Sequence, residues 1–177
     1  MQIGKYRFTR IYAATVAVVF IMLLLSWEYL NGGVQGHHVL QQKDLPFISN
    51  WWGLLLLPVL TWILWSRIEK RLGERPGKKE ASRTFWLFLL GLGLGVLISV
   101  SFLNKYHFVL DNILYILAAT SLIFPIFFSE VILGFVMGMV STFGVVLPTV
   151  FVLIISIVGF MIYRIVRAPF LKLFRQS

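Results

Sequence analysis

Residues 11 to 30 read IYAATVAVVFIMLLLSWEYL, an apolar run that is interrupted by a charge only at Glu28. At about 1.5 Å of rise per residue, a helix of this length crosses the roughly 30 Å hydrocarbon layer of a bilayer. Lys5, Arg7 and Arg10 precede the run, and no small-residue cleavage site follows it. We therefore expect an uncleaved membrane anchor rather than a signal peptide that is removed.

The composition of the whole chain indicates the same class. Of 177 residues, 59% are hydrophobic and 13% are charged, with a mean hydropathy of +0.87, whereas soluble domains are about 25% charged. There are too few polar residues to cover the surface of a soluble fold. The absence of cysteine excludes disulfides and thiolate nucleophiles. A net charge of +9 would indicate nucleic acid in a soluble protein, but here we expect membrane lipid as the partner and no nucleic acid.

The apolar runs predict an all-α, polytopic transmembrane helix bundle that forms a single domain over residues 1–177. Six spans are expected, at about 11–30, 51–66, 85–103, 109–127, 129–144 and 146–166. An outer loop at 31–50 and a basic cytoplasmic loop at 67–84 connect the first three. Because 129–144 is close to the shortest length that crosses a bilayer, a re-entrant pair of half-helices is the alternative for that segment.

Basic residues set the expected orientation. Fourteen of the 16 fall on one side of the predicted spans: three before residue 11, seven in 67–84 and four from Arg164 onward. Only Lys43 and Lys105 fall on the other side. Since basic residues concentrate in the cytoplasm, we predict that the N-terminus and the C-terminus are both cytoplasmic. This arrangement also puts Glu130 in a cytoplasmic turn near Pro125, where a charge avoids the hydrocarbon.

Small residues recur four apart on two of the predicted spans. Gly91, Gly95 and Ser99 form one such series, and Gly134 and Gly138 form another. Residues with this spacing lie on one face of a helix and let a neighbouring backbone approach closely. We expect both series to be packing faces rather than ligand sites.

The predicted topology places all three histidines, His37, His38 and His107, on the outer side. Imidazoles are ligands of zinc and other divalent metals, and three of them with an open position can activate water. Their spacing matches no specific metal motif, because adjacent histidines point in different directions and no H-E-x-x-H pattern is present. The simpler interpretation is that they are polar residues of wet interfacial loops.

The same side holds the candidate substrate-binding residues: Glu28, Asp44, Ser49, Asn50, Trp51, Asp111 and Asn112. They can form the rim of an outward-facing polar site for a small molecule. The alternative is structural, since Asp44, Ser49 and Asn50 suit a turn and a helix N-terminus, and Trp51 suits an interfacial anchor. A carboxylate in the position of Glu28 either faces the bundle or reaches interfacial water, and the sequence leaves both open.

The paired histidines and the stretch DLPFISNWWG at residues 44–53 resemble small uncharacterised bacterial inner-membrane proteins with an HH, DLP and SNWWG pattern. The resemblance covers about residues 31–66 and implies no activity. The chain is also loosely similar to six-span substrate-binding subunits of vitamin-uptake transporters, through its size, its termini and the small residues Ala13 and Ala17. With short loops and no sorting signal, we expect a bacterial inner membrane.

Three classes of function remain open from the sequence. The first is a small-solute binding or transport component, which would work with a membrane partner subunit that supplies energy. The second is a metal-dependent membrane hydrolase or transferase that acts on a lipid at the outer leaflet, with the histidines as ligands and Asp44 or Asp111 as base. The third is a structural or assembly subunit of a membrane complex.

Overall fold

The computed structural model describes residues 3–38, 47–73 and 77–164. Within these ranges the chain is helical except for one two-stranded hairpin and the turns between helices. Three segments are long and apolar enough to cross a membrane: Thr9–Leu30, Asn50–Leu72 and Lys78–Leu103. These segments support the membrane class that the composition predicts.

The first half of the chain forms three long helices. Helix α1 (Ile3–Leu30) is followed by the strands β1 (Gly36–His38) and β2 (Phe47–Ser49), which pair antiparallel with Gly36 opposite Ser49. One turn of 3₁₀ helix, η2 (Asn50–Trp52), then leads into α2 (Gly53–Leu72), and α3 (Lys78–Leu103) follows. The hairpin strands lie inside the predicted outer loop, so part of this polar loop is β-structure.

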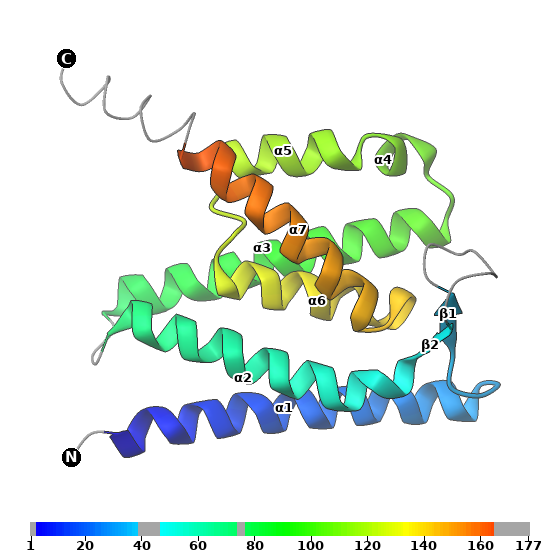
Figure 1. Cartoon of the computed structure of the whole chain (residues 1–177), viewed down its shortest axis with the longest axis horizontal. Coiled ribbons are helices and arrows are strands. Elements are labelled where there is room, and N and C mark those ends of the chain that lie inside the picture. The colour runs from blue at the N-terminus through cyan, green and yellow to red at the C-terminus, as the bar shows by residue number, and fades with distance from the viewer. Residues whose placement is uncertain (1–2, 39–46, 74–76, 165–177) are drawn as a thin grey trace.

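The second half forms four shorter helices. They are α4 (His107–Asp111), α5 (Ile113–Ile123), α6 (Ser129–Phe143) and α7 (Val146–Ile162). Figure 1 shows that successive passes of the chain run in opposite directions. The start of α1, the end of α2, the start of α3 and the end of α7 share one end of the molecule, which we call the charged end. The hairpin lies at the other, the hairpin end.

Helix α6 is the centre of the bundle. Ten of its 15 residues are buried, and α2, α3 and α7 all pack against it. Its 15 residues rise only about 22 Å, less than the roughly 30 Å of a bilayer core. Protein rather than lipid surrounds most of this helix, and a short helix is tolerated where protein can satisfy its ends.

The packing of α6 on α3 confirms the predicted faces of small residues. A Cβ atom added to Gly91 would overlap the carbonyl of Val131, and one added to Gly134 would overlap the carbonyl of Phe88. The Ser99 hydroxyl donates a hydrogen bond to the Gly138 carbonyl at 3.2 Å. The two backbones therefore lie in direct contact, which any larger side chain at these glycines would prevent.

Several predicted boundaries differ from the structure. Helix α2 continues to Leu72 and α3 begins at Lys78, so most of the predicted basic loop is helical. Lysine, arginine and glutamate favour helices, and the Gly77 amide donates to the Glu80 carboxylate at 3.1 Å to cap the start of α3. The predicted fourth span, 109–127, is broken into α4 and α5 around Asn112. Helix α5 ends at Ile123, close to the break expected at Pro125.

Candidate functional site

The structure brings together two of the predicted outer residues, Glu28 and Asn50. The Asn50 side-chain amide donates to one Glu28 carboxylate oxygen at 2.8 Å, and the Gln35 backbone amide donates to the other at 3.1 Å. Glu28 and Asn50 are only 8% and 5% exposed. Both carboxylate oxygens therefore accept hydrogen bonds inside the protein, and the pair joins the end of α1 to η2. Glu28 faces the bundle, which was one of the two possibilities that the sequence left open.

The neighbouring outer residues have local contacts. The Ser49 hydroxyl accepts from the Trp51 amide at 3.4 Å, which is the helix cap that the sequence predicted as the alternative to a binding role. Trp51 is 57% exposed. Gly144, with a φ of +67°, lies against the Asn50 side-chain oxygen, so that no room remains for a Cβ atom. Asn50 thus links the ends of α1, α2 and α6.

The remaining predicted residues do not form a cluster in the described part of the chain. His107 and Asp111 lie on α4, and the Asn112 side chain donates to the Phe108 carbonyl at 2.8 Å. Asp44 lies outside the described residues. His37 and His38 lie on β1, although their side chains are not described. Among the residues that the structure does describe, no group of three histidine, aspartate or glutamate side chains could hold a metal, and the zinc hypothesis stays a prediction.

At the charged end, two buried carboxylates pair with arginines on neighbouring helices. Glu69 of α2 pairs with Arg10 of α1 and also accepts from the Thr9 hydroxyl. Glu130 of α6 pairs with Arg71 of α2. The two glutamate side chains are 8% and 1% exposed, so each needs its cationic partner. Helix α2 is therefore joined to α1 through one carboxylate and to α6 through another.

Glu130 has the more demanding position. It lies in the first turn of α6, where the helix dipole favours a negative charge, and one of its two carboxylate oxygens has no hydrogen-bond partner. Arg71 also donates to the Thr84 hydroxyl at 3.4 Å, and its guanidinium lies 4.3 Å from the centroid of the Phe128 ring. The prediction that Glu130 lies in a turn near Pro125 is close, but the side chain is enclosed by protein rather than by water.

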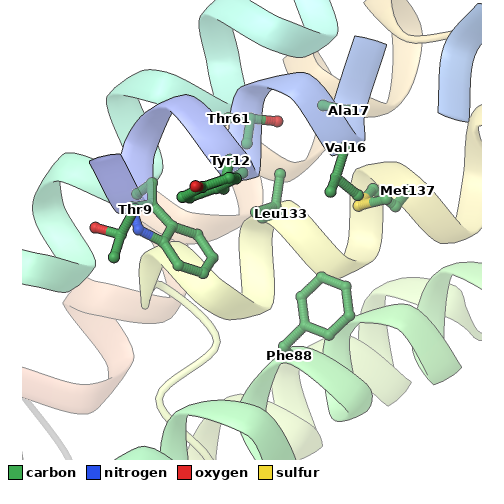
Figure 2. Close-up of a pocket in the computed structure, with 10 residues that line it drawn as sticks. Thr9, Tyr12, Val16, Ala17, Thr61, Phe88, Leu133 and Met137 are labelled. Atoms are coloured by element: carbon green, nitrogen blue, oxygen red, sulfur yellow. The ribbon is translucent and has the colours of Figure 1, made fainter. Parts of the chain in front are cut away.

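A cavity of about 390 Å³ lies between the helix pair α1 and α2 and the helix pair α3 and α6. One wall belongs to α1 and α2, and the opposite wall belongs to α3 and α6, as Figure 2 shows. The α1 wall carries Thr9, Tyr12, Ala13, Val16 and Ala17; the other helices contribute Thr61, Trp65, Phe88, Leu133 and Met137. Tyr12 and Val16 are 69% and 63% exposed, so the cavity opens on the flank of the bundle.

Polar groups in the walls are mostly satisfied within the protein. The Thr61 hydroxyl donates to the Leu57 carbonyl at 2.7 Å, and the Thr9 hydroxyl donates to Glu69. What remains is an apolar lining. Its volume lies in the range of about 300 to 1,000 Å³ that is typical of ligand sites.

Helix spacing places the paired charges at one end of this cavity. Residues three or four apart share a helix face, and Glu69 follows Trp65 by four residues on α2. Glu130 precedes Leu133 by three on α6, and Thr84 precedes Phe88 by four on α3. The same four helices thus line the cavity and supply the polar cluster at the charged end. The candidate site is therefore an apolar cavity with charged side chains toward one end.

Sequence reasoning did not find this site. Each partner in the two ion pairs lies 59 residues from the other, so no local motif joins them. The small residues Ala13 and Ala17, which the sequence analysis cites only for the loose similarity to transporter subunits, line the cavity in the structure. Comparison with known proteins returns no match to this chain among family models, curated proteins or solved structures.

Proposed function

We propose that the protein is a small-solute binding or transport component of a membrane, and that the solute is an apolar or amphipathic molecule held in the cavity between α1, α2, α3 and α6. The observation that carries the proposal is an apolar cavity of about 390 Å³ that is open on the flank of the bundle and has the buried carboxylates Glu69 and Glu130, each paired with an arginine, toward one end. A molecule dissolved in the bilayer can enter from the side without crossing water.

The proposal includes six spans with both termini in the cytoplasm. The alternating passes in Figure 1 and the gathering of Arg10, Arg71 and Arg83 near one end support this topology, because basic residues concentrate on the cytoplasmic side. The central position of α6 explains how a helix of only 15 residues can be one of the six. Under this topology, the charged end of the cavity faces the cytoplasmic leaflet.

The outer polar residues are less suited to bind a solute. Glu28 and Asn50 are hydrogen-bonded to each other, so a solute at that position would have to displace the hydrogen bond that joins the end of α1 to η2. The apolar cavity requires no such exchange. We therefore place the binding function in the cavity and assign Glu28 and Asn50 the role of fixing the hairpin to the bundle.

A neutral photoactivatable alcohol tests the proposal. The full chain, purified in detergent, is irradiated with a diazirine-labelled octadecanol, and mass spectrometry locates the cross-linked residues. We expect labelling on Tyr12, Val16 or Met137 and its loss in Ala13→Phe, in which the new ring fills the cavity. Val19→Phe is the matched control, because Val19 is 50% exposed on the same helix and does not line the cavity. Labelling spread evenly over the lipid-facing surface in both variants would overturn the proposal.

A further inference from the structure

Two arginines, Arg71 and Arg83, lie near one aromatic ring at the charged end of the bundle. The guanidinium carbons of Arg71 and Arg83 lie 4.3 Å and 5.7 Å from the centroid of the same ring, Phe128. Glu130 is the one carboxylate that pairs with either of them among the described residues. The group of Arg71, Arg83 and Glu130, which we call the Phe128 cluster, therefore has a formal charge of +1.

Toward the residues that the structure describes, the Phe128 cluster has hydrogen-bond donors that are not used. Both hydrogen bonds of Arg71, to Glu130 and to Thr84, come from one terminal nitrogen, Nη2. Arg83 is exposed at the start of α3 and has no ion-pair partner among the described residues. Guanidinium groups bind phosphate through two parallel N–H donors. Counted over the described residues, the cluster is therefore one negative charge short of neutrality, and its guanidiniums can donate hydrogen bonds to a phosphodiester.

The cluster and the cavity draw on the same helices. Glu130 precedes Leu133, a cavity residue, by three positions on α6, which is a rise of about 5 Å. On α3, Thr84 precedes the cavity residue Phe88 by one turn. A headgroup beside Arg71 and Arg83 would thus lie between one and two helical turns from an apolar cavity that is open to the bilayer along Tyr12 and Val16.

We infer that the ligand of this site is an anionic phospholipid of the surrounding membrane, with its phosphate on Arg71 and Arg83 and one acyl chain in the cavity. The inference rests on the proposed function and specifies its ligand. The charge of the cluster selects the headgroup, the apolar lining selects the chain, and the open flank along α1 is the route of entry. The anionic cytoplasmic leaflet would supply the lipid.

Native mass spectrometry of the full chain in detergent tests the inference. Dioleoyl phosphatidylglycerol and dioleoyl phosphatidylcholine share their chains and differ in net charge, so their relative retention reports the headgroup. We expect phosphatidylglycerol to bind at a concentration at least about fivefold lower than phosphatidylcholine, since each cation near an anionic headgroup contributes about that factor in affinity. Arg83→Gln should reduce this preference about fivefold. Lys79→Gln is the control, because Lys79 is exposed on the same helix end and is not part of the Phe128 cluster.

The outcomes separate the inference from the function on which it rests. Equal retention of the two lipids, or equal effects of Arg83→Gln and Lys79→Gln, would overturn the anionic headgroup. Undiminished binding of phosphatidylglycerol to Ala13→Phe would overturn the placement of its chain in the cavity. If the neutral alcohol still labels the cavity when the lipid preference is absent, the proposed function stands and the inference fails. If the alcohol does not label the cavity and the lipid preference is also absent, both the proposed function and the inference fail.

Discussion

Replacing Gly138 by alanine should weaken the central helix pair. A Cβ atom at this position would lie 2.5 Å from the Leu92 carbonyl oxygen and 2.9 Å from the Val96 nitrogen, both on α3. Carbon and carbonyl oxygen atoms in close helix contacts stay roughly 3.3 Å apart. Helices α3 and α6 would therefore have to separate by about 0.8 Å, the difference between roughly 3.3 Å and the distance in the structure.

The expected cost follows from that separation. A gap of about this size forfeits a quarter to a half of the attraction between facing atoms, and overpacking of a core typically costs about 1 to 3 kcal/mol. The hydrogen bond from Ser99 to the Gly138 carbonyl, worth about 1 kcal/mol, would also lengthen. We expect Gly138→Ala to lower the free energy of unfolding by about 2 kcal/mol.

Gly93→Ala provides the matched control. Gly93 lies on α3, two residues from Gly91, and a Cβ atom there meets no atom within 4 Å. Alanine favours a helix over glycine by up to about 1 kcal/mol, so this variant should be unchanged or slightly more stable. Equilibrium unfolding of both variants in mixed micelles, titrated with SDS and followed by circular dichroism, measures the difference. Equal stability of the two variants would refute the direct contact of the α3 and α6 backbones.

Three further predictions concern the polar contacts. Arg71→Met should destabilise the protein by about 3 kcal/mol, because Glu130 would remain buried without its partner. The double variant Arg71→Met/Glu130→Leu should recover most of that loss. SDS unfolding measures both variants, and a double variant as unstable as the single one would contradict the pairing. Asn50→Leu should cost about 1 to 3 kcal/mol, since one Glu28 oxygen loses its donor, and unfolding monitored by tryptophan fluorescence would show it; no loss would argue against a role for Asn50 in joining the helices. Gly144→Ala and Gly73→Ala both strain a backbone with positive φ, at about 1 to 3 kcal/mol each, but only Gly144 also contacts Asn50, so its variant should have the lower melting temperature; the reverse order would count against that contact.

The membrane class and the helix-packing faces follow from local sequence. A chain with 59% hydrophobic residues cannot cover itself with polar groups, whatever its tertiary arrangement. The four-residue spacing of Gly91, Gly95 and Ser99 is a property of one helix, and it predicted a close approach that the structure contains. The cap at Ser49 was likewise predictable, because a cap depends only on the residues that directly follow it.

The candidate site depends on how helices are rotated and placed against one another. Glu69 and Glu130 look in the sequence like ordinary charges near helix ends, and the sequence does not show that each faces an arginine 59 residues away. Similarly, the cavity draws its walls from four helices, and none of them carries a motif for it. Local sequence determines which helix faces carry apolar or small residues. Long-range packing decides which of these faces contact one another, and the buried ion pairs and the cavity form only at those contacts.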